Sequence, residues 1–215
     1  MTQAQTNPVV VELYTSQGCS SCPPADEFMA QLVNDPNLIA LSLHVDYWDY
    51  IGWKDTFGNP QFTKRQKSYA RAIGSRTIYT PQMIVGGVDR VEGNDPMKVL
   101  DSIRKHLMAG SPVSLSVRRE GDKVAIRIEA NPPLQRGTRV QVVRYLPKAS
   151  VEIERGENAG QTVDYHNVVT SWQAVADWSG QEAFEMMADA PGTEPVVVIV
   201  QSEGPAEILA AARAD

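Results

Sequence analysis

The two cysteines of this chain, Cys19 and Cys22, are three positions apart and stand between an apolar run and a helix-like segment. Residues 9–14 are rich in valine, as in a buried strand, and residues 25–33 carry apolar side chains at helical spacing. A strand that turns into a helix with Cys-x-x-Cys at the junction is typical of a redox-active dithiol. This pair constrains the fold more than any other feature, because it demands alternating strands and helices around it.

The chemistry of a dithiol explains this placement. The first amides of a helix and the positive end of its dipole stabilise a thiolate, so Cys19 is predicted to be the accessible attacking thiol. Cys22, one turn further along, is predicted to be buried and close enough to resolve a mixed disulfide on Cys19.

Three other interpretations of the cysteine pair stay open. Zinc takes about four protein ligands, whereas the chain has no other cysteine and its histidines, His44, His106 and His166, are scattered, so no metal is expected. A structural disulfide across so short a loop removes little chain entropy and stabilises little. Two unrelated buried cysteines are the third alternative.

Composition limits the class of protein and its partners. With 215 residues, 42% apolar and 21% charged, the chain is typical of a globular protein with one large or two small domains. A net charge of −6 without a basic run argues against a nucleic-acid partner. No apolar stretch reaches the roughly 18 residues of a transmembrane helix.

The N-terminal segment, residues 1–8, is polar and lacks the charged and apolar regions of a signal peptide. Two localisations therefore follow. Either the protein is cytoplasmic, or the leader of an exported protein has been replaced by an initiating methionine.

The first half alternates strand and helix patterns. Strands are predicted over residues 9–14, 39–45, 82–85 and 88–91, and helices over residues 25–33, 61–73 and 97–108. Pro23 and Pro24 remove two backbone donors, so regular hydrogen bonding in the first helix is expected to start late. The Gly-Ser-Pro run at 110–112 ends the alternation and predicts a boundary, with residues 1–110 as an α/β domain.

From residue 111 to 215 the pattern has a period of two, which predicts a second domain that resembles an antiparallel β-sandwich. Strands are predicted over residues 114–117, 124–130, 139–145, 151–155, 163–170 and 195–201. Residues 208–212 are ambiguous. Their alanines favour a helix, whereas the turn at 203–205 favours a hairpin strand, which we prefer.

The order of strands and helices around Cys19 and Cys22 resembles the thioredoxin fold. Thr80 and Pro81 stand directly before the predicted hairpin, and the resemblance implies that Pro81 is a cis-proline that faces the dithiol. An extended substrate would dock there through backbone hydrogen bonds, as in strand addition.

Residues 12–26, 155–160 and 165–169 resemble a narrower family of uncharacterised bacterial proteins, many of them exported, with a Cys-Ser-Ser-Cys motif and no assigned function. This resemblance covers nearly the whole chain. It implies a periplasmic or exported location, but it implies no substrate.

An aromatic segment, residues 46–57, separates the second strand from the next helix. Two interpretations apply to Tyr47, Trp48, Tyr50 and Trp53. They line a groove beside the dithiol, where ring faces and polar atoms give contact area, or they pack on themselves as a loop over the sheet edge.

Glu12 lies in the strand before the motif. If its strand parity points it inward, its carboxylate is a candidate acceptor for the proton of Cys22. A solvent-facing glutamate is the alternative. His44 and His166 are interpreted as structural, because neither has a recognisable partner in the sequence.

Residues 155–160 are predicted to form a turn between strands. Within it, Glu157 and Asn158 are candidates for contact with the catalytic domain or with a partner protein.

These features predict a thioredoxin-like α/β domain followed by a β-sandwich-like domain, acting as a thiol–disulfide oxidoreductase on protein or small-molecule thiols. Cys19 attacks, Cys22 resolves, and Thr80 and Pro81 dock a protein or peptide substrate without a cofactor. The alternative is a non-catalytic binding or assembly module with a structural disulfide, for which a reduction potential below about −300 mV is diagnostic.

Overall fold

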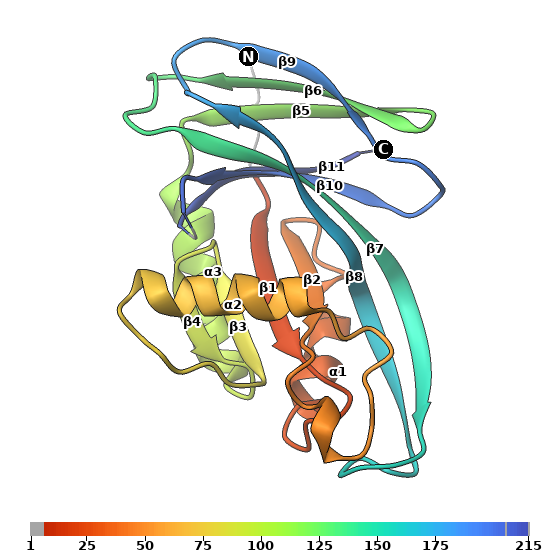
Figure 1. Ribbon diagram of the computed structural model, residues 1–215. Helices are drawn as coiled ribbons and strands as arrows, with labels where there is room; N and C mark the ends of the chain where they lie inside the picture. Colours follow the sequence, from red (N-terminus) through yellow and green to blue (C-terminus); the bar gives the residue numbers. More distant parts are fainter. Residues whose placement is uncertain (1–6, 205, 215) are drawn as a thin grey trace.

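The computed structural model describes residues 7–204 and 206–214 as a mixed α/β protein (Figure 1). Its elements in chain order are β1 (Val9–Thr15), α1 (Pro23–Leu32), β2 (Leu38–His44), η1 (Asp49–Ile51), α2 (Pro60–Ala72), β3 (Gln82–Val85), β4 (Asp89–Glu92), α3 (Pro96–Ala109), β5 (Val113–Glu120), β6 (Lys123–Ala130), β7 (Thr138–Ile153), β8 (Gln161–Trp178), β9 (Phe184–Asp189), β10 (Val196–Ser202) and β11 (Ile208–Ala214). Residues 1–6 of the polar N-terminal segment and residue 205 of the predicted turn lie outside the described residues.

A large sheet runs through both halves of the chain, in the order β11-β10-β7-β8-β2-β1-β3-β4. β2 pairs in parallel with β1 on one side and, through Ser42 and Val168, with β8 of the second half on the other. Two side-chain bonds strengthen this junction: Ser42 Oγ donates to His166 O, and Asn167 Nδ2 donates to Ala40 O, both at 2.8 Å. The sheet therefore continues across the expected domain boundary.

Helices cover both faces of the part of this sheet formed by β1, β2 and β3. α1 and α3 pack against one face and α2 packs against the other (Figure 1). The side chains of β1 alternate accordingly, with Val11 and Leu13 on the side of α1 and Tyr14 on the side of α2. All of β1 is buried, as expected for a strand that is covered on both faces.

A smaller antiparallel sheet, β5-β6-β9, packs on the part of the large sheet formed by β7, β10 and β11. Val196, Val198 and Val200 of β10 face this small sheet, whereas Val197 and Ile199 belong to the core on the opposite face. Burial on both faces explains the continuous valine run of β10. The expectation of a self-contained sandwich is therefore wrong in one respect: one of its two layers is shared with the first half.

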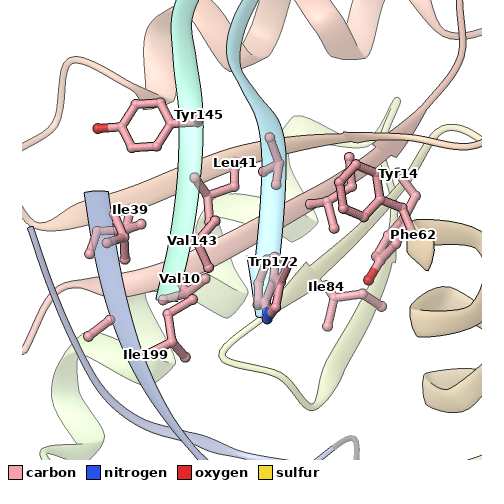
Figure 2. Packing of buried hydrophobic residues seen from close by; sticks show 14 of the residues in the cluster. Val10, Tyr14, Ile39, Leu41, Phe62, Ile84, Val143, Tyr145, Trp172 and Ile199 are labelled. Carbon is pink, nitrogen blue, oxygen red and sulfur yellow. The ribbon is translucent and has the colours of Figure 1, made fainter. Parts of the chain in front are cut away.

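Figure 2 shows a core cluster that both halves build. Tyr14, Leu41 and Phe62 from the first half lie in it together with Val143 and Trp172 from the second. Because the burial of apolar side chains is the main favourable term in folding, the two halves share a core as well as a sheet. The division into folding units at residue 110 stays a prediction.

Some element boundaries differ from the sequence-based expectation. The strands expected over residues 139–145 and 151–155 are one strand, β7, whose pairing with β8 passes from Leu146 to Lys148 and so tolerates the exposed Pro147 between them. β9 is an element that was not predicted. The preference for a hairpin at the C-terminus is confirmed, because β11 pairs antiparallel with β10.

Candidate functional site

Cys19 and Cys22 form a disulfide between β1 and α1, with their Cα atoms 5.4 Å apart. Cys22 is the N-cap residue of α1 and already has a helical backbone conformation. It is fully buried, as expected. Cys19, however, is only 2% exposed, so the expectation of an accessible Cys19 is wrong for this disulfide form.

α1 begins immediately after Cys22 in spite of its two prolines. Pro23 and Pro24 occupy the first helical positions, where a backbone N–H has no partner inside the helix. Ala25 N and Asp26 N then donate to Cys22 O, at 2.9 and 3.1 Å. The expectation of a late start is therefore wrong, because the missing donors are not needed at these positions.

Ser21 connects Cys19 to the loop before β3. Its Oγ lies 3.4 Å from Cys19 Sγ and donates to Thr80 O, also at 3.4 Å. The Thr80–Pro81 peptide bond is cis, which confirms what the resemblance implied. Gly93 lies so close to Pro81 that a Cβ on this glycine would be 2.8 Å from Pro81 Cβ. Thr80 is thus adjacent to the motif, while its role in docking stays a prediction.

Trp48 and Tyr50 of the aromatic segment lie beside Thr80. Trp48 Nε1 donates to Thr80 Oγ1 at 2.7 Å, and its ring stacks on that of Tyr50 with the centroids 6.4 Å apart. Tyr50 is 80% exposed. These two rings therefore offer an apolar platform to solvent next to the candidate docking residues.

Tyr47 and Trp53 are tied to their neighbours instead. Tyr47 OH donates to Gln66 Oε1 on α2 at 3.3 Å, and Trp53 Nε1 donates to Gln17 Oε1, in the loop before Cys19, at 2.8 Å. The aromatic segment therefore divides between the two interpretations: Tyr47 and Trp53 pack as a loop, whereas Tyr50 is presented to solvent.

Asp26 is a buried carboxyl group one helical turn after Cys22. Residues four apart on a helix share a face, with Cβ atoms about 5–6 Å apart. Asp26 is 2% exposed, and its Oδ1 has no hydrogen-bond partner among the described residues. Burial raises the pKa of Asp26 to about 7, although His44 offsets part of this effect. A group that exchanges a proton near neutral pH therefore lies beside Cys22.

His44, at the end of β2, and Asp55, in the aromatic segment, form a second buried pair. His44 Nδ1 and Asp55 Oδ2 are 2.8 Å apart, and both side chains are fully buried. Asp55 also accepts bonds from Gln17 N and Phe57 N, each at 2.8 Å. Burial alone would raise the pKa of Asp55, but His44 and these backbone donors outweigh it and lower that pKa. Asp55 is therefore the acceptor, and Nδ1 of His44 carries the hydrogen.

Glu12 lies on the face of β1 that is opposite to α1. Both of its oxygens accept bonds from Arg65, at 2.7 and 2.8 Å, and further bonds come from Tyr14 OH at 2.8 Å and Tyr69 OH at 2.7 Å. The strand parity does point Glu12 inward, but toward α2. The structure therefore does not bring Glu12 to Cys22, and the carboxyl group next to that cysteine is Asp26.

The long hairpin of β7 and β8 reaches from the second half of the chain to the motif (Figure 1). Asn158 in its turn is 3% exposed, and its Nδ2 donates to Gln17 O at 2.9 Å and to Cys19 O at 3.0 Å. Tyr165 of β8 packs edge-on against the ring of His44, with the centroids 4.7 Å apart. The turn between strands is observed, and Asn158 within it contacts the first half of the chain at Gln17 and Cys19.

Sequence reasoning missed Asp26 and Asp55. A signal for Asp26 was present, because it shares a helical face with Cys22 and the buried Met29 at the spacing of four and then three residues. No comparable local signal marks Asp55, whose partner His44 is eleven positions away and is reached only when the aromatic segment folds back.

The last two features of the described residues concern metal ligands and membrane-spanning helices. Among the described residues, no three His, Cys, Asp or Glu side chains gather in a way that could hold a metal ion. Within the same residues, no helix combines the length and the apolar character needed to cross a membrane.

Comparison with known proteins places the chain. The sequence pattern of a family described as "Protein of unknown function (DUF1223)" matches residues 10–201. The chain belongs to this DUF1223 family. A comparison with curated proteins finds no match.

Two solved structures are similar to this DUF1223 protein. An X-ray crystal structure of a protein from Agrobacterium tumefaciens shares 32% sequence identity over 98% of this chain and 96% of its own, with a TM-score of 0.83. HBP35 of Porphyromonas gingivalis shares 13% identity over 97% of this chain and 74% of its own, with a TM-score of 0.69. At that identity, the second likeness concerns the fold alone.

Proposed function

We propose that this DUF1223 protein is a thiol–disulfide oxidoreductase built on a thioredoxin-like arrangement of its first half. The observation that carries the proposal is the disulfide at the N-terminus of α1, with the buried carboxyl group of Asp26 one turn further along. The cis peptide bond at Thr80–Pro81, linked to the motif through Ser21, supports the same assignment.

The reaction is a pair of thiol–disulfide exchanges. A substrate thiolate attacks Cys19 Sγ, the Cys19–Cys22 bond breaks, and Cys22 leaves as a thiolate that takes a proton from Asp26. A second substrate thiolate then attacks the substrate sulfur of the mixed disulfide and releases Cys19 as a thiolate. The substrate dithiol loses two electrons to become a disulfide, the protein's disulfide gains them, and the reverse sequence reduces a substrate.

The substrate class follows from the surroundings of the motif. An extended polypeptide can pair with the backbone at Thr80 and lay an apolar side chain on the rings of Trp48 and Tyr50. We therefore propose a protein or peptide thiol as the partner. Because disulfides persist in oxidising compartments, we further propose that the protein works in the periplasm or outside the cell.

A second function is favoured by a different observation, the burial of both cysteines. A covered disulfide with a very low reduction potential would act only as a structural link, and the protein would then be a binding or assembly module. Structural disulfides typically have potentials below about −300 mV. The potential therefore separates the two functions.

Trapping on defined single-cysteine variants tests the enzyme proposal. Reduced Cys22→Ser protein, mixed with a short peptide disulfide at pH 7, should form a stable mixed disulfide on Cys19, because no second thiol can release it. Cys19→Ser should form none at a comparable rate, since Cys22 is fully buried. Ser20→Ala, which keeps both cysteines, should exchange without accumulating an adduct. If Cys22→Ser traps nothing and the wild-type potential lies below about −300 mV, the protein is the binding module.

A further inference from the structure

The turn of the β7–β8 hairpin, residues 154–160, is here called the arm tip. Each of its residues is exposed except Asn158, which is 3% exposed and whose side chain contacts the motif. The arm belongs to the second half of the chain and reaches down to α1 (Figure 1). The side chain of Asn158 bonds to the backbone of Gln17 and Cys19, and so links the β-rich half to the motif.

The amide of Asn158 is fully engaged with the motif. Its nitrogen carries two hydrogens, and they are donated to the carbonyls of Gln17 and Cys19. The same segment is held from the other side, where Gln17 N donates to Asp55 Oδ2 and Gln17 Oε1 accepts from Trp53 Nε1. The backbone that presents Cys19 is therefore clamped between the arm and the aromatic segment.

The arm tip is a turn that holds itself together. Its internal bonds run from Ala159 N to Gly156 O (3.3 Å), from Gly160 N to Ile153 O (2.7 Å) and from Gln161 N to Asn158 O (3.2 Å). Gly156 and Gly160 have positive φ angles, which glycine adopts without steric cost. Two of these bonds tie the tip to the ends of β7 and β8 at Ile153 and Gln161, and none of the three involves the motif, so a displacement of the tip from the motif does not require them to break.

The base of the arm, by contrast, is anchored. Its residues 165–168 are joined to the first half through Tyr165 against His44 and through the sheet contact of Val168 with Ser42. A displacement of the tip from the motif would break the two hydrogen bonds of Asn158 to Gln17 O and Cys19 O. It would also separate Gly156 from Trp53, whose Cβ lies 3.2 Å from the position of a Cβ on this glycine.

We propose that Asn158 is a positioning residue for Cys19 and that the arm tip is a cover which a reacting thiol or other reductant must displace. In this way the β-rich half sets the reactivity of the redox motif. The inference rests on the proposed function for its biological meaning, but the cover itself is a property of the disulfide that chemistry can measure directly.

The test is the rate at which a water-soluble phosphine reduces the disulfide of the folded, full-length chain, followed by alkylation of the released thiols. Asn158→Ala removes both bonds, and two neutral hydrogen bonds correspond to roughly a tenfold or larger gain in the open population. We therefore expect reduction about ten times faster than in the wild type. Glu157→Gln, an exposed neighbour in the same tip, is the matched control and should react like the wild type.

Asn158→Asp gives a readout that a loss of packing would not. At pH 7 its carboxylate faces two carbonyl oxygens and repels them, so reduction should be at least as fast as in Asn158→Ala. Near pH 3.5 the protonated acid regains one donor, and the rate should fall back toward that of the wild type. Phosphines reduce disulfides at both pH values, which allows the comparison.

The outcomes separate this inference from the proposed function. If folded Asn158→Ala and Asn158→Asp are both reduced at the wild-type rate, the cover is refuted even when Cys22→Ser traps substrate. If both react faster but nothing is trapped, the cover stands and the enzyme proposal falls. If Asn158→Ala does not fold, the pH profile of Asn158→Asp decides: a rate that is the same relative to the wild type at both pH values refutes the positioning role.

Discussion

Two buried ionic clusters lie on opposite sides of the sheet around β1, and they are built differently. On the side of α2, the carboxylate of Glu12 forms a bidentate ion pair with Arg65 and also accepts hydrogen bonds from two tyrosine hydroxyls. On the side of α1, Asp26 Oδ1 and His44 Nε2 have no hydrogen-bond partner among the described residues. One cluster is complete and the other is not.

The completed cluster acts as a joint. Arg65 also donates to Gln141 of β7 and Gln201 of β10, and its guanidinium lies 3.8 Å from the ring centroid of Trp172 on β8. Such a network holds the two halves in one arrangement, because each of its members loses its partners if the halves shift. Its carboxylate, Glu12, lies on the face of β1 opposite to α1, whose N-terminus carries Cys22.

The incomplete cluster is suited to chemistry. A buried polar atom without a partner costs free energy and calls for an explanation, and shifted pKa values gather at functional sites. Here one of the unpartnered atoms belongs to Asp26, an ionisable group one helical turn after Cys22. The difference between the clusters teaches that burial alone does not single out a candidate acid, whereas burial with unfilled hydrogen bonds next to the disulfide does.

The largest effect is expected from breaking the completed cluster. Glu12→Gln leaves the largely buried guanidinium of Arg65 without its counter-charge, and loss of one partner of a buried pair typically costs about 3–5 kcal/mol in the free energy of unfolding. Urea unfolding at pH 7 measures it. Glu157→Gln, an exposed carboxyl group, is the control and should change stability by less than about 0.5 kcal/mol. A loss below about 1 kcal/mol for Glu12→Gln would remove the contrast between the clusters.

In the incomplete cluster we expect a substitution to raise the free energy of unfolding instead of lowering it. The pKa of Asp26 is raised from 3.8 to about 7 in the folded protein, so folding binds its proton and the wild type loses stability as the pH rises through that window. A rise of three pKa units destabilises the folded wild type by about 4 kcal/mol above that window. In the variant, a buried amide without a partner destabilises the fold by about 1–3 kcal/mol. Asp26→Asn should therefore be more stable than the wild type by about 1–3 kcal/mol at pH 8.

The pH series supplies the check on that gain. At pH 4 the folded wild type is protonated at Asp26, so the gain disappears and the cost of the unpartnered amide should leave Asp26→Asn less stable than the wild type by up to about 1–3 kcal/mol. Glu27→Gln, an exposed position on the same helix, should show no gain at either pH. Equal stabilities of Asp26→Asn and the wild type from pH 4 to pH 8 would mean that Asp26 titrates normally.

The smallest effect is expected when one hydroxyl group is removed from the completed cluster and the ion pair of Glu12 and Arg65 is kept. Tyr69→Phe removes one donor to Glu12 and one acceptor for Arg65, but the ion pair itself stays. We expect a loss of about 1–2 kcal/mol in urea unfolding at pH 7. Tyr50→Phe, at an exposed ring, is the reference. A loss of unfolding free energy as large as that of Glu12→Gln would show that the hydroxyl, and not the ion pair, stabilises the link between the two halves.

The sequence was sufficient for local structure and for the motif. The strand before the cysteine motif, the helix after it and the hairpin of β3 and β4 are all recovered. These features depend on residues close together in the chain, where periodicity and turn chemistry act directly. The cis peptide before Pro81 is recovered too, but it was implied by the resemblance to the thioredoxin fold and not by the local pattern.

Contacts between distant segments could not be predicted in the same way. Inward parity was foreseen as a condition for Glu12, but not which face is inward, because that depends on where α1 and α2 pack. The pairing of β8 with β2 joins residues more than 120 positions apart, and no local pattern encodes it. The same applies to the hydrogen bond from Asn158 to the backbone carbonyl of Cys19.

The continuous sheet has a consequence for how such proteins can be recombined. Without the second half, the outer edge of β2 becomes an unpaired strand edge, and Ile39, Leu41 and Leu43 lose the part of their core cluster that β7, β8 and β10 supply. Such an edge is a template for pairing with another chain. A gene fusion that exchanges the β-rich half must therefore supply a replacement strand for this edge. We therefore expect the two halves to be inherited together in one gene and not to be exchanged independently.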